Sequence, residues 1–513
     1  MTVSTVTLTP STPGTPRVLG AGAVAEQHPA HHDLIRRVSQ PGYQWWLTHV
    51  MSAAACSRPV RLKLEAHWHG SAGTEIDQVT AGMPDGALYV ACKNRRTSVC
   101  PACAQTYRAD TYQLVKAGLV GGKGVPETVS EHPCLFVTLT APSFGLVHTR
   151  VIGHNGQVRP CRARRNTEPC PHGRPQTCLE RHHEHDPRVG EPICRDCYDY
   201  RHQAAWNFHA GELWRRTTIA LNRALAHAGR IRDTRVRLSF AKVAEYQRRG
   251  VIHFHALIRL DGRDLDNPDA ILAPDPSITI DHLRSYVDHA AASTSFTTEP
   301  HPVNPSGWPI HWGAQVDIRT VKLSPADADD HGTLTTTAVA AYLAKYATKA
   351  TEETGHISRR LDSLGIDLHT EHDTHQARQL LACWELGSRP LNCRTKAQRE
   401  AWAQGWRKLQ KWAHMLGYGG HFSTKSRRYS TTLGALRAVR KAFKRGDPIE
   451  PAQPELPHDA DPDGDDSIVT LNWIFDGVGW LTLGDAMLAN TAAAKARERK
   501  QIAREEVEEA IGK

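Results

Sequence analysis

Two histidines and two tyrosines stand at spacings that place each pair on one side of its element. His253 and His255 are two residues apart in an apolar stretch typical of a β-strand, and side chains alternate along a strand, so both imidazoles leave the same face. Tyr342 and Tyr346 are four residues apart in an alanine-rich segment typical of a helix, where that spacing also brings two side chains together. Two converging imidazoles can bind a divalent metal, and a tyrosine beside a metal indicates phosphodiester chemistry on DNA.

Glu245 is the candidate for a third metal ligand, because a hard cation such as Mg²⁺ or Mn²⁺ prefers an oxygen donor. The residues on both sides of 247–250 have the composition of strands that pair as a hairpin, and in that register Glu245 lies opposite His253. We therefore expect Glu245, His253 and His255 to bind a catalytic Mg²⁺ or Mn²⁺. A His-x-His pair alone is more often structural, and the same ligand set binds iron in non-haem oxygenases. The tyrosine helix favours the DNA-cleaving interpretation.

Tyrosine is a weak nucleophile at neutral pH because its ordinary pKa is about 10. Lys345 and Lys349 each follow a tyrosine by three residues, so all four side chains can line one face of the helix. A nearby cation stabilises the phenolate, or holds the scissile backbone. We expect Tyr342, Tyr346, Lys345 and Lys349 to be catalytic; the alternative is a half-buried helix that only packs on the sheet.

Nine of the twelve cysteines lie between Cys92 and Cys197, including two C-x-x-C pairs, and this clustering indicates structural zinc. We expect one or two sites. In one partition, Cys92, Cys100 and Cys103 form a first set that takes its fourth ligand from elsewhere. Cys170, Cys178, Cys194 and Cys197 form a complete second set. His172 competes with Cys170 or Cys178 for a place in the second set. The alternatives are a single ribbon built from the two pairs, or a group of buried or free thiols.

The elements that position these residues have a mixed order. Strands are expected over residues 134–142, 236–246, 251–260 and 314–323, and helices over residues 201–228, 281–292 and 335–349. Their order along the chain is strand, helix, strand, strand, helix, strand and helix. Few parallel crossovers fit that order. We predict the α+β class: a central antiparallel sheet with flanking helices on one face, an inserted zinc-binding finger and a helical basic C-terminal region.

Composition divides the chain into five parts. They are a disordered N-terminus (1–35), a region with the first cysteine cluster (36–133), an endonuclease domain (134–350) with a zinc-finger insertion (155–200), a helical basic DNA-binding extension (351–446), and an acidic linker and tail (447–513).

The net charge of +9 is modest, but residues 394–446 contain fourteen lysines and arginines and one acid. Such a segment attracts polyanions. The residues expected to contact DNA are Lys425, Arg427, Arg428, Arg407 and Lys408. Six aromatic side chains in the segment could stack on bases, or could form the core beneath a solvated basic face: Trp402, Trp406, Trp412, Tyr418, Phe422 and Tyr429. The sequence has no apolar run near twenty residues and no secretory signal, which predicts a soluble cytoplasmic protein. It also has no nucleotide-binding loop, which predicts that the protein has no helicase activity of its own.

Three of these segments together resemble a known family. The strand 136–140, the His253-Phe254-His255 strand and the Tyr342/Tyr346 helix look like motifs one, two and three of the His-hydrophobe-His endonucleases that initiate rolling-circle replication. The chain is similar, over roughly residues 85–445, to large replication initiators of actinomycete plasmids and integrative elements. The strings that carry this likeness are 140–145, 210–216 and 419–429. In conjugative relaxases the tyrosine precedes the histidine strand, whereas here it follows.

The resemblance implies an initiator that binds a plasmid origin and nicks one exposed strand. Tyr342 or Tyr346 would attack the phosphorus, leaving a 5′-phosphotyrosine and a 3′-hydroxyl that primes synthesis. The second tyrosine, or in some relatives a glutamate-activated water, would close the cycle. Origin DNA, a host helicase and a polymerase are the implied partners, and no membrane is involved. Two alternatives are a paired-tyrosine single-strand transposase and a zinc-containing DNA-binding regulator without nicking activity.

Overall fold

The computed structural model describes residues 29–70, 73–164, 168–232, 234–322, 334–349, 360–391, 393–445 and 468–511. The chain forms two compact units, one made of residues 1–92 with 465–513 and the other of residues 93–464. Sequence composition had placed the boundaries differently, at 35, 133, 350 and 446. Of the expected disordered terminus, residues 1–28 lie outside the described part, and Pro29–Val38 is helix α1. The expected acidic linker, up to residue 466, also lies outside it.

The first unit is built around strand β1 (Val60–Gly70), which pairs antiparallel with β14 (Ile468–Val478), β2 (Gly73–Asp77) and β3 (Leu88–Val90). Its other elements are α1, α2 (Tyr43–Val50), the 3-10 turn η1 (Pro84–Gly86) and α12 (Leu483–Ile511). The expectation that 447–513 is only a linker and tail is wrong from β14 onward, because β14 pairs with β1 at ten register positions, with one shift between Arg61 and Leu62.

The second unit contains a six-stranded sheet in the order β12-β11-β4-β8-β7-β13. The strands are β4 (Cys134–Leu139), β7 (Val236–Tyr246), β8 (Ile252–Gly262), β11 (Val316–Lys322), β12 (Leu334–Thr335) and β13 (Ser423–Lys425). All neighbours pair antiparallel except β11 and β12. The predicted central antiparallel sheet within a mixed α+β chain is therefore confirmed.

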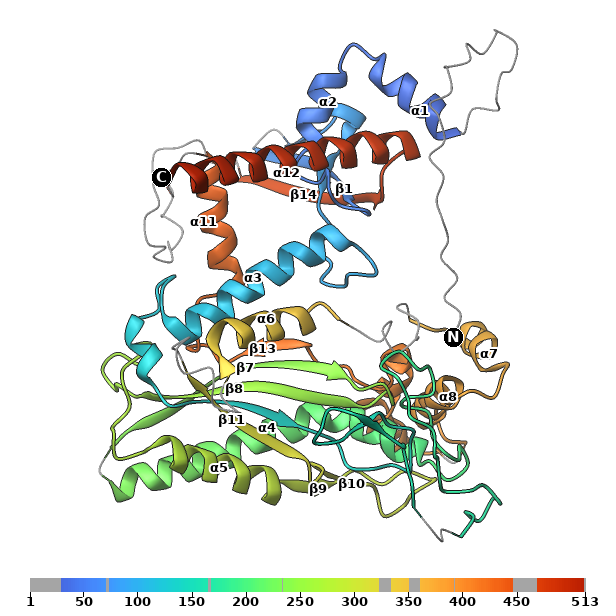
Figure 1. Ribbon diagram of the computed structural model, residues 1–513. Coiled ribbons are helices and arrows are strands. Elements are labelled where there is room, and N and C mark those ends of the chain that lie inside the picture. The colour runs from blue at the N-terminus through green and yellow to red at the C-terminus, as the bar shows by residue number, and fades with distance from the viewer. Residues whose placement is uncertain are drawn as a thin grey trace, which may run out of the picture. The chain divides into compact units, whose positions relative to one another are not determined.

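Helices cover both faces of this sheet, not one (Figure 1). Helices α4 (Tyr200–Ile231) and α5 (Ile280–Ser293) lie on one face, and α3 (Pro101–Val120) and α6 (Thr336–Tyr346) on the other. The reason is visible in β4, where Leu135 and Val137 join the core under α4 while Phe136 joins the core under α6. A central strand that is apolar on both faces needs a helix layer on each.

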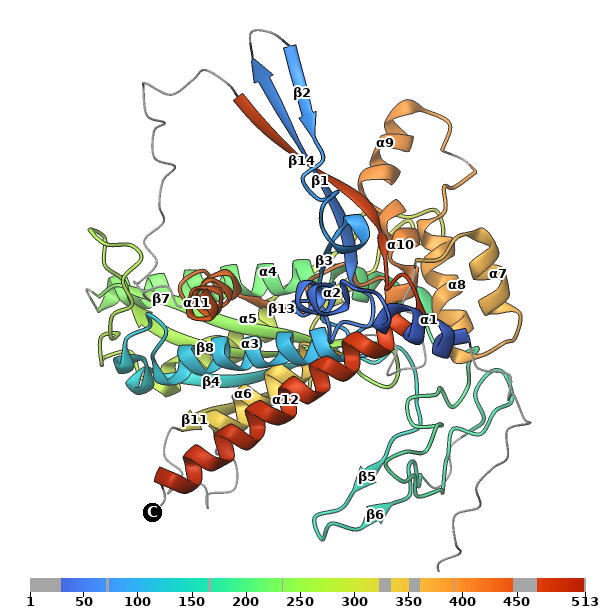
Figure 2. The same ribbon diagram turned by 90° about the horizontal axis from the view of Figure 1, so that it is seen from above.

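The remaining elements of the second unit surround the sheet. A largely irregular insertion between β4 and α4 carries the short hairpin β5 (Val151–Ile152) and β6 (Val158–Arg159), as Figure 2 shows. The other elements are η2 (Glu127–Glu131), β9 (Ser295–Thr297), β10 (Pro309–His311), α7 (Ser363–Thr370), α8 (His375–Gly387), α9 (Lys396–Gln404), α10 (Arg407–Lys411), η5 (Ala413–Met415) and α11 (Leu433–Arg445). Among the described helices, none has the length and apolar content needed to cross a bilayer.

Candidate active site and metal centres

The β7–β8 hairpin places Glu245 directly opposite His253, the register expected from the sequence. The hairpin closes through Gly250, whose φ of +74° lies in the left-handed region and whose N–H donates to the Gln247 carbonyl. A side chain at Gly250 would meet the Gln379 amide at 2.4 Å. The left-handed backbone conformation thus favours glycine at this position. The short turn fixes which residues of the two strands face each other.

The three predicted metal ligands converge. One carboxylate oxygen of Glu245 lies 3.1 Å from Nε2 of His253 and 3.1 Å from Nε2 of His255. Octahedral metal–ligand bonds of about 2.1 Å put neighbouring donor atoms about 3 Å apart, so the residues present fit a Mg²⁺-like or Mn²⁺-like cation. On the neighbouring strand β4, the Thr138 hydroxyl lies 3.0 Å from Nδ1 of His255 and orients that ring.

The charge state of this cluster also suits metal binding. Burial disfavours the charged form of Glu245, but hydrogen bonds and charge from His253 and His255 outweigh it and lower the pKa of this carboxyl to about 2. Burial lowers the pKa of His255, against the opposing effect of the Glu245 hydrogen bond. A carboxylate and a neutral imidazole are the forms that donate electron pairs to a cation.

Tyr342 projects from α6 onto the cluster. Its hydroxyl oxygen lies 3.1 Å from Nε2 of His255, and its ring meets the His255 ring edge-on with centroids 5.0 Å apart. Thr335 caps the N-terminus of helix α6, because its side chain accepts from the Ala338 N–H. Burial, and then the negative charge of Glu245, raise the pKa of Tyr342 above its ordinary value. The phenol is therefore protonated in the protein alone.

Tyr346 lies beside Tyr342, with ring centroids 4.4 Å apart, and 6.0 Å from the His255 ring. The two predicted catalytic lysines gather at Tyr346 rather than at Tyr342: Nζ of Lys349 is 4.8 Å and Nζ of Lys345 is 5.7 Å from the Tyr346 ring centroid. The two phenols thus differ in surroundings, one next to the ligand cluster and the other next to two cations.

Arg95 is a residue of this region that sequence reasoning missed. Its guanidinium donates to the carbonyls of Ala347 (3.1 Å) and Lys349 (2.7 Å), which follow the C-terminus of α6, and stacks 4.0 Å from the Phe422 ring centroid. A cation at a helix C-terminus stabilises the exposed carbonyls. Arg95 lies some 250 positions before the helix in sequence, so no local pattern could have pointed to it.

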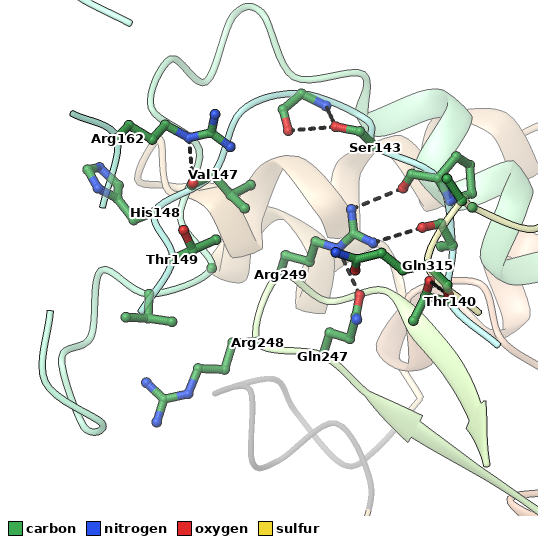
Figure 3. Close-up of a pocket in the computed structure, with 17 residues that line it drawn as sticks. Thr140, Ser143, Val147, His148, Thr149, Arg162, Gln247, Arg248, Arg249 and Gln315 are labelled. Atoms are coloured by element: carbon green, nitrogen blue, oxygen red, sulfur yellow. Dashed lines mark hydrogen bonds between the residues drawn. The ribbon is translucent and has the colours of Figure 1, made fainter. Parts of the chain in front are cut away.

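A cavity of about 570 Å³ adjoins the hairpin turn (Figure 3). The end of β4, the turn 247–249 and the insertion line it. The Arg249 guanidinium donates to the carbonyls of Ala141 and Pro142, as Figure 3 shows, and so joins the turn to the end of β4. Three arginines of the lining give the cavity a positive character: Arg162, Arg248 and Arg249.

The insertion brings together Cys170, His172, Cys194 and Cys197, whose ligand atoms all lie within 4.8 Å of one another. Nδ1 of His172 is 3.2 Å from Sγ of Cys197 and 3.8 Å from Sγ of Cys194. Burial opposes ionisation of Cys170, but hydrogen bonds from the backbone at Arg174 and His172 and from the two neighbouring thiols lower its pKa to about 7. Three thiols and one imidazole form a donor set typical of structural zinc.

Cys178 is not part of this group, so His172 takes the place that the preferred partition gave to Cys178. The difference arises because Cys178 pairs in an isolated bridge with Arg162, which carries it toward another part of the insertion. Of the first predicted set, Cys92 belongs to the first unit, where its N–H donates to Sγ of Cys56 (3.3 Å). Cys100 caps α3 and Cys103 lies in its first turn, both in the second unit. Their zinc role stays a prediction.

The residues predicted to contact DNA differ in how far their side chains are exposed and free of other contacts within the protein. Nζ of Lys425 donates to three backbone carbonyls, and burial lowers its pKa, so this lysine has a structural role. Arg427 and Arg428 both pair with Asp269 but remain partly exposed, whereas Arg407 and Lys408 are exposed on α10. The stacking interpretation is wrong for four aromatic side chains, because they are buried in the core: Trp406, Tyr418, Phe422 and Tyr429.

Comparisons with known proteins define the class. Residues 42–494 match the family described as "RepSA: Replication initiator protein, pSAM2". A replication initiator protein of Streptomyces ambofaciens is 39% identical over 490 residues, which cover 93% of this chain and 96% of that protein. No solved structure matches the chain.

The protein is thus a replication initiator, and it belongs to the pSAM2 RepSA family. The similarity to actinomycete replication initiators that the sequence motifs indicated is confirmed. A replication initiator acts at origin DNA, which agrees with the basic segment of the chain.

Proposed function

We propose that this initiator nicks one DNA strand at a plasmid origin and rejoins it through a 5′-phosphotyrosine. One observation carries the proposal: the Tyr342 hydroxyl lies 3.1 Å from His255, whose Nε2 lies 3.1 Å from the Glu245 carboxylate. A nucleophile that adjoins a cluster of metal-binding donors is the arrangement that phosphodiester cleavage requires. Neither the family match nor the fold alone points to a particular side chain.

The chemistry is a transesterification. The Tyr342 oxygen forms a bond to phosphorus, the bond from phosphorus to the 3′ oxygen breaks, and the 3′ oxygen leaves with a proton as a hydroxyl. A Mg²⁺ or Mn²⁺ held by Glu245, His253 and His255 would polarise the scissile phosphate. Since Tyr342 is protonated in the protein alone, attack also needs the phenol proton to be lost once DNA is bound.

The difference between the two phenols supports an order of events. Tyr342 adjoins the ligand cluster and is proposed as the first nucleophile. Tyr346, next to Lys345 and Lys349, is proposed to attack in the second, strand-closing step, when the regenerated origin is resolved. The two lysines would stabilise its phenolate and the DNA backbone.

Arg407, Lys408, Arg427 and Arg428 are proposed to contact origin DNA, and Lys425 to hold the loop after β13 in place for them. Binding through such residues weakens as salt rises. A helicase and a polymerase supplied by the host would extend the 3′-hydroxyl. A paired-tyrosine transposase would share the same groups, but the family match is to replication initiators.

The test uses full-length protein, supercoiled plasmid carrying the cognate origin, and Mg²⁺ or Mn²⁺. Wild type should yield nicked circles with protein attached. Tyr342→Phe should lose the covalent adduct, and mapping of the phosphotyrosyl peptide should identify residue 342. Tyr286→Phe, on α5 at the opposite face of the sheet, is the matched control and should behave as wild type.

A Tyr342→Phe/Tyr346→Phe double variant that nicks as well as wild type would refute the proposal. Wild type that shifts origin DNA in a gel without ever cutting it would instead indicate a zinc-containing regulator. An adduct mapped to Tyr346 alone would keep the nickase and reverse the proposed order of the tyrosines.

A further inference from the structure

The insertion contains a second group of metal-binding side chains, of which sequence reasoning had picked out only Cys178. His148, Cys161 and the pair Cys178 and His182 come from three separate stretches of the insertion, and their ligand atoms all lie within 4.8 Å of one another. Cys161 and His182 are buried. Ordering a segment with little regular structure costs conformational entropy. The convergence of two thiols and two imidazoles in such a segment therefore requires an interaction that offsets this cost.

The distances match a tetrahedral site. Bonds of about 2.05 Å to nitrogen and about 2.3 Å to sulfur place two nitrogens about 3.4 Å apart and a nitrogen and a sulfur about 3.6 Å apart around tetrahedral zinc. Nδ1 of His148 is 3.2 Å from Nε2 of His182, and Sγ of Cys178 is 3.5 Å from the same Nε2. His148, Cys178 and His182 are thus spaced as ligands of one ion, and Sγ of Cys161 lies within 4.8 Å of their ligand atoms.

Outer contacts orient two of the four ligands. Nδ1 of His182 lies 2.7 Å from the Asp186 carboxylate, which Arg188 also binds, so the ring's other nitrogen, Nε2, presents its lone pair to the cluster. The Thr149 N–H donates to Sγ of Cys161 at 3.1 Å. A carboxylate behind a ligating histidine is a common feature of zinc sites, where it fixes the tautomer and the ring orientation.

The same segment lies against the hairpin turn that links Glu245 to His253. The Arg248 guanidinium donates to the backbone carbonyls of Glu184 and Asp186, just after the ligand His182. Gly190 packs so closely on the turn that a Cβ there would be 2.6 Å from the carbonyl carbon of Arg248. The Gly190 N–H donates to the carbonyl of the ligand His148 (2.9 Å).

We propose that His148, Cys161, Cys178 and His182 bind a structural zinc ion, and that this ion holds residues 182–190 against the β7–β8 turn. Zinc would then act on the candidate active site as a positioning element, by fixing the turn that sets the register of Glu245 and His253. It would also fix one wall of the cavity in Figure 3, which the neighbours of His148 and Cys161 line.

The first experiment measures zinc content in the purified full-length protein. Cys161→Ser and His182→Ala should each lower it by one equivalent relative to wild type, and His183→Ala, an exposed neighbour of His182, should not. In cobalt-substituted protein, Cys161→Ser should also reduce the thiolate-to-cobalt absorption. Zinc content equal to that of wild type in a His148→Ala/Cys161→Ser variant would overturn the site.

A milder variant guards against loss of folding. Asp186→Asn keeps all four ligands but weakens the orientation of His182, and it should lower zinc affinity by about 10-fold to 100-fold in competition with a chromophoric chelator. Unchanged affinity would contradict the outer-contact argument that supports the site.

The second experiment tests the positioning role without any DNA. Asp186→Asn protein stripped of this zinc should bind Mn²⁺ at Glu245, His253 and His255 more weakly, by about 10-fold, and should exchange amide hydrogens faster at residues 246–252. Wild-type Mn²⁺ affinity and exchange after zinc loss would refute the positioning role. The Mn²⁺ readout rests on the metal site of the proposed function, whereas amide exchange at the turn does not, so failure of the positioning role and failure of the nickase are distinguishable.

Discussion

Two groups of metal-binding side chains in the second unit differ in both donor type and support. The group on the sheet has three donors, one carboxylate and two imidazoles, held by a paired hairpin: Glu245, His253 and His255. The group in the insertion has four donors, three of them thiols, in a segment with little secondary structure: Cys170, His172, Cys194 and Cys197. Three donors leave coordination positions for a phosphate oxygen and water on a six-coordinate cation, whereas four donors, three of them soft thiolates, close a tetrahedral ion.

The contrast indicates how this protein would divide metal functions under the proposed function. Where backbone hydrogen bonds already fix the ligands, a bound ion would be free to meet a substrate. Where the chain lacks paired strands, a bound ion would supply the order itself. The following predictions test this division.

The largest effect is expected for Glu245→Gln. The amide keeps the shape of the side chain but removes the negative charge that attracts the cation, so single-turnover cleavage of an origin oligonucleotide should fall about 10³-fold. Zinc content should stay at the wild-type value. Glu127→Gln, exposed in η2, is the control. Cleavage within a few-fold of wild type would show that the sheet group does not hold the catalytic ion.

Compared with Glu245→Gln, Cys194→Ser is expected to reduce cleavage less and to reduce stability more. Loss of one thiolate should remove a zinc equivalent and lower the free energy of unfolding by about 3 kcal/mol, as followed by thermal unfolding. Cys393→Ser, outside the candidate clusters of the described chain, is the matched control. If Cys194→Ser retained full zinc and wild-type stability, the insertion group would have no structural role.

The smallest effect is expected for Thr138→Val, which keeps the β-branched shape and removes the hydroxyl beside Nδ1 of His255. Mn²⁺ affinity, measured by titration calorimetry, should fall about 10-fold, with the zinc content and the unfolding temperature unchanged. A Thr138→Ser variant keeps the hydroxyl and should restore most of the affinity. Equal affinity in all three proteins would mean that the hydroxyl does not orient the ring.

Much of the geometry of the candidate active site follows from the sequence because it rests on short-range rules. A five-residue connection between Tyr246 and Ile252 fixes the hairpin register, and helical periodicity puts Tyr342 and Tyr346 on one side. The contact between Tyr342 and His255, across 87 positions, was inferred only from the chemistry that the two groups share.

What sequence reasoning missed depends on long-range packing. The second helix layer was not expected, because nothing local in Pro101–Val120 shows that it covers the sheet. Cys178 is predicted to join Cys170, Cys194 and Cys197, whereas it lies with His148 and Cys161, which precede it by 30 and 17 positions. Burial of Tyr418 and Tyr429 in a basic segment was equally hidden, since composition does not distinguish a solvated face from the core beneath it.

The pairing of β1 with β14 bears on how the chain is made. Val60 and its partner Val478 are separated by the whole second unit, so a ribosome must release residues 93–464 before the first unit can close. The nascent first unit therefore waits with an unpaired strand edge, which is a hazard for misassociation during translation. Circular permutation that joins β14 directly to β1 would remove that delay.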